Sequence, residues 1–216
     1  SYSTISDAIA YTYQQDGHMF YVLTFPTANV TWVYDAATQM WHQRGYVSDT
    51  TGQLNRHTPT CMATLGTRVY VGHDTLPEIG YYDFSYFNNE FTNARRQVWL
   101  RSWRALPSDA NNLKRTAQHS LQLDCEAATS TVAEISTTGA SAEMNASLRW
   151  SDDGGHTWSN LHTVSMGYEG QTGRRVIWRR LGMTMKLRDR VYEVSGSGFG
   201  NVAIMGAELI ASGTNA

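Results

Sequence analysis

Residues 151–158 read Ser-Asp-Asp-Gly-Gly-His-Thr-Trp, and this stretch says most about the fold. Asp153 is placed to accept hydrogen bonds from the backbone of its own turn, as Asp does in Asx-turns. The glycines at 154–155 allow a positive φ because they carry no Cβ atom. Thr157 and Trp158 return the chain to an extended conformation, in which the indole covers the apolar face of the strands. The stretch therefore predicts a turn that closes a β-hairpin.

The same residues fit the pattern Ser-x-Asp-x-Gly-x-Thr-Trp, which resembles the Asp-box motif. Its fixed positions are Ser151, Asp153, Gly155, Thr157 and Trp158. Asp-boxes occur in sialidases, in sugar-binding modules and in structural proteins, so the motif indicates local structure and leaves function open. We expect these five residues to form a structural turn. Loss of Asp153 or Thr157 should therefore weaken the hairpin and should not affect any chemical reaction.

The remainder of the chain shows short apolar or alternating segments between turn signals, which is the all-β pattern. Aromatic residues make up 12% of the 216 residues, and helix-period runs are almost absent. We predict an all-β protein. It consists of a partial β-propeller with kelch-like four-stranded blades, followed by a small antiparallel β-sandwich that contains the Asp-box hairpin.

The first half of the chain predicts two propeller-like blades. Strands of the first blade are expected at residues 5–13, 18–25, 30–35 and 39–44, and four strands in about 40 residues is the size of one blade. A weaker second copy is expected at 60–65, 67–73 and 78–84, with a less regular piece near 86–91. Two blades cannot close a propeller. We favour a piece of a larger propeller, although the two sheets could instead pack on each other or on a neighbouring subunit.

The second half predicts a sandwich of about six strands. The expected strands are 117–126, 145–151, 158–166, 174–181, 189–195 and 201–210, with an exposed Ser- and Thr-rich loop at 128–143. A basic, Trp-rich segment at 95–104 resembles a domain junction. The predicted domains are therefore blades at 1–94, a junction at 95–116 and the sandwich at 117–212.

Composition excludes several classes of protein. The net charge of −2 and the pI of about 6.4 are unlike those of a polycationic nucleic-acid binder. Cys61 and Cys125 stand alone, which indicates free buried thiols and neither a disulfide framework nor a zinc site. No apolar run reaches membrane-spanning length, and no signal-peptide pattern begins the chain, so a soluble protein without membrane insertion is expected.

No motif selects an enzyme, a metal site or a cofactor. The seven histidines lack a metal-ligand spacing. The glycine-rich stretch 196–200 links two strands and has no following helix to bind phosphate. A sialidase needs an arginine cluster, a tyrosine nucleophile with a glutamate partner, and an acid, and no such constellation stands out. We therefore predict no catalysis and no cofactor.

Two basic clusters hold thirteen of the seventeen lysines and arginines. The first comprises Arg95, Arg96, Arg101, Arg104, Lys114 and Arg115, and the second Arg174, Arg175, Arg179, Arg180, Lys186, Arg188 and Arg190. Ordinary solvated strand faces would explain them, as would contact with phosphate or with an acidic subunit surface. Arginine outnumbers lysine, which suits bidentate interface contacts. The candidates for an interface or for contact with DNA are Arg174, Arg175, Arg179, Arg180, Arg188 and Arg190.

Three segments together resemble a known family. They are Met-Phe-Tyr-Val-Leu-Thr-Phe-Pro-Thr … Met-Trp-His-Gln-Arg-Gly (19–45), Leu-Arg-Trp-Ser-Asp-Asp-Gly-Gly-His-Thr-Trp-Ser (148–159) and Arg-Arg-Val-Ile-Trp-Arg-Arg-Leu-Gly … Arg-Asp-Arg-Val-Tyr-Glu-Val-Ser (174–195). Their order and spacing resemble the C-terminal half of packaged-DNA stabilisation proteins, the tail-hub or nozzle proteins of short-tailed bacteriophages.

This resemblance implies a structural protein of the virion, located in the phage tail and assembled in the host cytoplasm. Family members form a homo-oligomer, a hexameric ring beneath the portal and adaptor proteins. The ring retains packaged DNA, with nonspecific DNA contact, and carries a tail spike, fibre or needle. It also forms the conduit for genome ejection. The alternative is a carbohydrate-binding or sialidase-like module that binds glycans through exposed aromatic residues such as Trp41 or Trp158.

Overall fold

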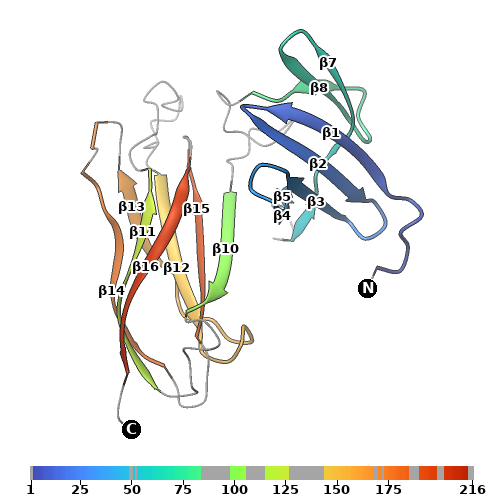
Figure 1. Cartoon of the computed structure of the whole chain (residues 1–216). Helices are drawn as coiled ribbons and strands as arrows, with labels where there is room; N and C mark the ends of the chain where they lie inside the picture. Colours follow the sequence, from blue (N-terminus) through green and yellow to red (C-terminus); the bar gives the residue numbers. More distant parts are fainter. Residues whose placement is uncertain are drawn as a thin grey trace. The chain divides into compact units, whose positions relative to one another are not determined.

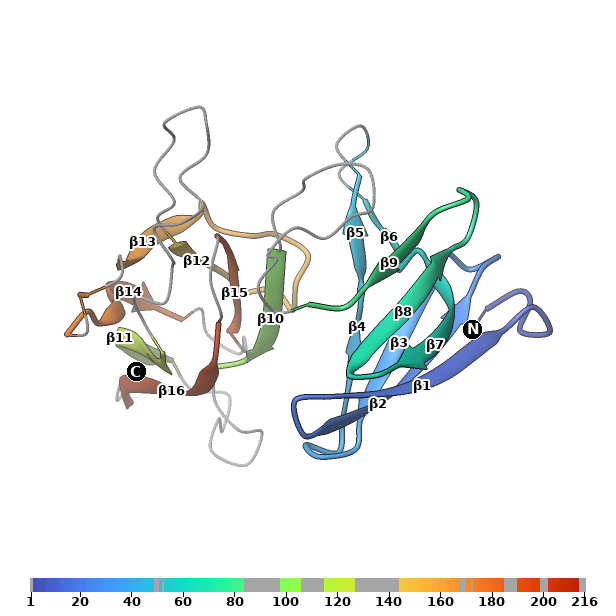
Figure 2. The same ribbon diagram turned by 90° about the horizontal axis from the view of Figure 1, so that it is seen from above.

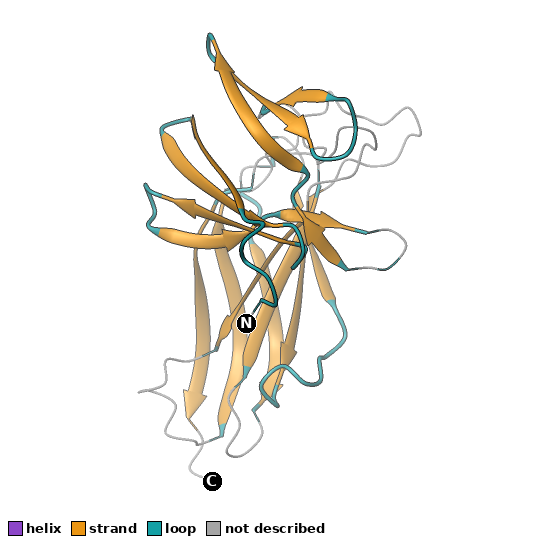
Figure 3. Cartoon of the chain, turned by 90° about the vertical axis from the view of Figure 1, so that its right-hand side faces the viewer, coloured by secondary structure: helices purple, strands orange, loops and turns teal. Residues whose placement is uncertain are grey.

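The computed structural model contains strands and loops and no helix in its described part, as Figure 3 shows. It describes residues 2–48, 51, 53–83, 98–105, 115–126, 144–167, 170–171, 173–184, 190–198 and 202–213. The chain divides into two compact units, residues 1–94 and residues 95–216. The all-β class is thus confirmed. The loop expected at 128–143 and the irregular piece near 86–91 lie outside the described residues.

The first unit begins with a four-stranded antiparallel meander. Its strands, in sheet order, are β1 (Ile9–Gln15), β2 (His18–Phe25), β3 (Val30–Asp35) and β4 (Met40–Gln43). The ranges of β2 and β3 are the predicted ones. Strand β1 starts later than expected because the residues before it form a turn, closed by a hydrogen bond from Ala8 N to Ile5 O.

A second, three-stranded sheet packs on one face of this meander (Figure 1). It contains β7 (Pro59–Leu65), β8 (Arg68–His73) and β9 (Ile79–Tyr81), and a short hairpin of β5 (Gly45–Val47) and β6 (Leu54–Arg56) precedes it. Tyr13, Val22 and Val33 of the meander form the core together with Val69 of β8. Two sheets packed in this way are compatible with neighbouring blades, but the structure contains no closed propeller among its described residues.

A polar network is buried between these two sheets. The guanidinium of Arg44 donates a hydrogen bond to the hydroxyl of Tyr13 and lies 5.4 Å from the ring centroid of Phe20. The Tyr82 hydroxyl lies 2.9 Å from Nε2 of His57. Burial, together with the Arg44 charge, lowers the pKa of His57 to about 3. The imidazole is therefore neutral at physiological pH, and the network carries its positive charge on Arg44.

The second unit is a sandwich of two antiparallel sheets, seen from above in Figure 2. One sheet has the order β10-β15-β12-β13 and the other the order β14-β11-β16. The strands are β10 (Val98–Arg104), β11 (Thr116–Cys125), β12 (Met144–Ser151), β13 (His162–Gly167), β14 (Val176–Met183), β15 (Val191–Ser197) and β16 (Ile204–Gly213). Inward side chains such as Leu121, Leu148, Trp178 and Tyr192 form one core.

Strand β10 corrects the expected junction at 95–116. Its residues pair with β15 along the whole strand, from Val98 opposite Ser197 to Arg104 opposite Val191. Trp99 and Trp103 pack against the sandwich core. The segment is therefore a seventh strand of the sandwich, because two tryptophans on one face of a strand are stabilised by an apolar surface and the core supplies one.

Candidate functional site

The Asp-box connects β12 to β13, and its hydrogen bonds lie almost entirely within the loop. The Ser151 hydroxyl donates to Oδ1 of Asp153 (2.6 Å) and accepts a bond from Gly155 N (2.8 Å). Thr157 donates twice to the same carboxylate, from its N to Oδ1 (2.8 Å) and from its hydroxyl to Oδ2 (2.6 Å). Gly154 and Gly155 have φ of 76° and 99°, the left-handed conformations expected from the sequence. The loop engages both carboxylate oxygens.

Trp158 is not among the described residues that form the core of the sandwich. Its ring lies under the guanidinium of Arg149, with Cζ 4.6 Å from the ring centroid, and Arg149 also forms an ion pair with Glu193. Stacking of a cation on an indole is favourable where both stay partly solvated. Trp150, the second-to-last residue of β12, packs against the core instead. The indole of Trp158 therefore seals the outer side of the hairpin.

The Asp153 carboxylate predicts a pH dependence of stability. The Ser151 hydroxyl, followed by the Thr157 hydroxyl and backbone, lowers the pKa of Asp153 well below its usual range. A depressed folded-state pKa stabilises the fold above the unfolded pKa of about 3.9, and this contribution is lost as pH falls through the folded pKa. We expect Asp153→Asn to lower the urea midpoint at pH 7, and the deficit relative to wild type to shrink below about pH 4.

Urea titrations of both proteins between pH 3 and pH 7 measure this dependence. Asp16→Asn is a suitable control, because it also changes an Asp next to a turn glycine, Gly17, without removing an Asp-box carboxylate. A deficit of the Asp153 variant that is constant across this pH range would show that the loop does not stabilise the ionised carboxylate.

Arg190 is not available to an interface, which corrects its prediction as a candidate. It is only 2% exposed. Its Nε and Nη2 donate to the two carboxylate oxygens of Asp152 (2.7 and 2.9 Å). The same guanidinium donates to the carbonyl oxygens of Leu181 (2.6 Å) and Met183 (3.1 Å) and lies 5.2 Å from the Trp150 ring centroid. Arg190 therefore ties the Asp-box loop to the end of β14.

The other candidate arginines of β14 and its approach are exposed. These are Arg174, Arg175, Arg179 and Arg180, whereas Arg188 lies outside the described residues. The side chain of Arg174 donates to the Ser165 carbonyl (3.3 Å). Within the described ranges, neither Arg179 nor Arg180 forms an ion pair with a carboxylate. Both side chains are exposed.

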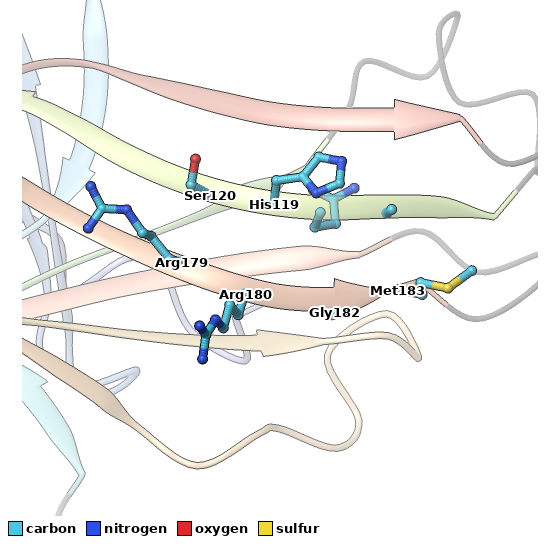
Figure 4. Close-up of a pocket in the computed structure, with 8 residues that line it drawn as sticks. His119, Ser120, Arg179, Arg180, Gly182 and Met183 are labelled. Atoms are coloured by element: carbon cyan, nitrogen blue, oxygen red, sulfur yellow. The ribbon is translucent and has the colours of Figure 1, made fainter.

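A bulge places Arg179 and Arg180 beside a shallow hollow of about 550 Å³. The register of β11 and β14 shifts between Gln118 and Ser120, and Arg180 has a φ of 61°. Figure 4 shows the two arginines leaving β14 in different directions, with His119 on the neighbouring β11. Because the guanidinium groups diverge, the hollow suits an extended anionic surface better than one small anion.

The first basic cluster is only partly described. Arg95, Arg96 and Lys114 lie outside the described residues, as does Lys186 of the second cluster. Arg101, Arg104 and Arg115 are exposed. Within the described residues, the exposed cations of the sandwich therefore include members of both clusters.

The prediction that both cysteine thiols are buried was wrong for Cys61. Cys61 is exposed and Cys125 is half-buried. Alternation along β7 places Cys61 on the side away from the core, a result that depends on the partner sheet. The glycine-rich stretch also differs from the expected loop, because Gly196 and Ser197 belong to β15.

Sequence reasoning missed an aromatic row in the first unit. Tyr21, Tyr34 and Trp41 lie directly opposite one another on β2, β3 and β4. Trp41 is 52% exposed and meets Tyr21 edge-on, with ring centroids 6.3 Å apart. The alternation of residues along the three strands places each aromatic residue on one face, but only the pairing of the strands brings the three rings together.

Neither a metal site nor a membrane span is found in the described part of the chain. No three His, Cys, Asp or Glu side chains gather there in a way that could hold a metal ion. No helix long and apolar enough to cross a membrane occurs in those same ranges.

Comparison with known proteins identifies the second unit. Residues 108–211 match the family model described as bacteriophage P22 Gp10, β-sandwich. The match covers strands β11 to β15 and most of β16, which together form the sandwich apart from β10. A search of curated proteins found no match to the chain. The match of residues 108–211 therefore supports the resemblance to the C-terminal half of the tail-hub proteins of short-tailed bacteriophages, and it indicates a structural protein of a phage tail.

Proposed function

We propose that this chain is part of the tail hub, or nozzle, of a short-tailed phage. In this role it forms part of a homo-oligomeric, hexameric ring under the portal and adaptor, retains packaged DNA and anchors a spike, fibre or needle. It also serves as a conduit during genome ejection. The observation that carries the proposal is the match of residues 108–211 to the P22 Gp10 sandwich. A structural tail role also agrees with the expected absence of enzymatic activity.

The exposed arginines supply a physical means of attachment. A ring presents Arg174, Arg175, Arg179 and Arg180 once per subunit, so modest contacts add up through multivalency. Guanidinium groups bind phosphate and carboxylate without reading sequence. The side chains of Arg179 and Arg180 diverge around the bulge, which favours a broad anionic surface of a neighbouring protein or of DNA.

The first blade supports the same assembly. Its inner face packs on the β7–β9 sheet, while Tyr21 and Trp41 on its outer face are 37% and 52% exposed. A propeller blade normally buries both faces against neighbouring blades. We therefore propose that the two sheets of the first unit are blades of a partial propeller whose outer aromatic face is covered by a further sheet.

The direct test is an image of assembled tails with this chain labelled. We expect the label in a ring at the tail, and a label elsewhere, or none, would contradict the proposal. Arg179→Glu should weaken binding of the chain to portal–adaptor complexes, or to DNA, by about tenfold. Arg68→Glu, an exposed arginine of the first unit, is the control and should change binding less than about twofold.

The exposed aromatic row keeps a glycan-binding module as a second candidate. Aromatic faces such as that of Trp41 are suited to stacking on apolar sugar faces. The Asp-box itself adds no catalytic carboxylate, because the loop engages both oxygens of Asp153. Binding on a glycan array that is lost in Trp41→Ala would support the module, and an array without hits would remove it.

A further inference from the structure

Strands β10 and β16 form one side of the sandwich, and each is an edge strand of its sheet. The opposite side is joined where Trp178 Nε1 of β14 donates to the His162 carbonyl of β13 (2.6 Å). Since β13 and β14 end their sheets on that side, β10 and β16 end them on the other, as Figure 2 shows. Each of these two strands pairs with a neighbour along one edge only among the described residues. Their remaining edges present backbone donors and acceptors to a further strand.

Strand β16 lacks the usual protection of an edge. Its ten residues are exposed except for Gly206 and Leu209, which are half-buried. Met205 is 73% exposed and Ile210 54% exposed. From Gly206 to Gly213 every residue of β16 pairs with β11, so no bulge of β16 interrupts this stretch. Its only charged residue is Glu208, and natural edge strands normally carry lysine, proline or a bulge that prevents further pairing.

Strand β10 is complementary to β16 in polarity and charge. On its outer face Val98 and Leu100 are 53% and 58% exposed. Its charged residues are both cations, Arg101 and Arg104, and both are exposed. Val98 and Leu100 of β10 lie next to arginines, and Ile210 of β16 lies near Glu208. Apolar side chains can thus face each other across the two strands while opposite charges also meet, and cross-strand pairs of both kinds stabilise a sheet.

We propose that β16 of one copy of this chain pairs with β10 of a second copy, antiparallel, with Leu100 opposite Ile210. This register places Val98 opposite Ser212 and Arg104 diagonal to Glu208, within reach of a long side chain. The three-stranded sheet of one copy then continues into the four-stranded sheet of the next. Two different strands meet in this contact, β16 of one copy and β10 of the other. This inference rests on the proposed function, because the pairing requires that copies of the chain meet in the tail.

Disulfide cross-linking of the full chain tests the pairing. Leu100→Cys and Ile210→Cys are combined in a Cys61→Ser background, which removes the exposed native thiol. The contact holds the two engineered thiols close, so we expect intermolecular cross-links to form at least about tenfold faster than in either single variant. The matched control combines Ile210→Cys with Leu161→Cys, since Leu161 is 59% exposed and lies outside both edge strands.

Each outcome decides for or against the pairing. Intermolecular cross-links specific to the Leu100–Ile210 combination support it. If the Leu161–Ile210 control cross-links as fast as the Leu100–Ile210 variant, the cross-links arise from random collision. If Ile210→Cys alone cross-links as fast as the Leu100–Ile210 variant, β16 pairs with β16. Either result overturns the proposal. If wild-type chain enters labelled tails but the double variant does not cross-link there, the edge pairing is wrong while the tail function stands. Absence of the chain from tails contradicts the proposed function itself.

Discussion

Replacing Arg190 with methionine is expected to destabilise the sandwich by about 3 kcal/mol. The substitution keeps most of the volume of the side chain but removes a buried cation. It leaves the Asp152 carboxylate and the carbonyl oxygens of Leu181 and Met183 without their donor. Removal of one partner from a buried pair is costly because the other partner stays desolvated without compensation. Ring contacts with Trp150 and Tyr192 are lost as well.

Urea unfolding followed by tryptophan fluorescence measures this loss. The second unit contains Trp99, Trp103, Trp150, Trp158 and Trp178, five of the seven tryptophans, so the signal reports mainly on the sandwich. Arg175→Met, at an exposed arginine, is the control and should change stability by less than about 0.5 kcal/mol. In a cycle with Asp152→Asn, the two losses should not add. Equal effects of Arg190→Met and Arg175→Met would show that Arg190 does not hold the loop.

Replacing Gly196 with alanine is expected to cost about 1–3 kcal/mol. A Cβ atom at this position would lie 2.3 Å from Cζ2 of Trp99 and 2.7 Å from the carbonyl oxygen of Asn145. The ring belongs to β10 and the carbonyl to β12, which flank β15 on its two sides. The strand therefore needs glycine for packing, since both neighbours would have to move to admit a methyl group.

Gly206→Ala provides a control in which the expected change in stability has the opposite sign. A Cβ atom at Gly206 of β16 meets nothing within 4 Å, so alanine there should leave stability unchanged or raise it by up to about 1 kcal/mol. Both variants are compared by the same urea unfolding. Combining Gly196→Ala with Trp99→Leu should recover only part of the loss, because the Asn145 carbonyl remains in place. Full recovery would show that the indole alone requires the glycine.

Local segments were the most predictable part of the fold. The range of β2 follows from a nearly continuous apolar run that ends at Pro26, and the range of β3 from a short strand that ends at the turn after Asp35. Within that turn the Asp35 carboxylate accepts hydrogen bonds from Ala37 N and the Thr38 hydroxyl, both at 2.9 Å. Such turns depend on residues two or three positions apart, which a sequence shows directly.

The candidate site was predictable only in part. The Asp-box loop forms from neighbouring residues, so its hydrogen bonds follow the motif. The arginines next to it could not be sorted from the sequence, because Arg179 and Arg190 have the same charge and similar neighbours. Arg190 is buried where two carbonyl groups of β14 and the Asp152 carboxylate converge, whereas Arg179 leaves the bulge toward solvent.

The sequence by itself determined the all-β class, the Asp-box turn and the strands that alternation marks, because each depends on residues close together in the chain. Only the tertiary structure decided that β10 belongs to the sandwich, that Gly196 accommodates Trp99, that Arg190 is buried and that β16 pairs along one edge only among the described residues. These features depend on contacts between segments far apart in sequence. Their partners are chosen by packing in the folded protein, which no local pattern records.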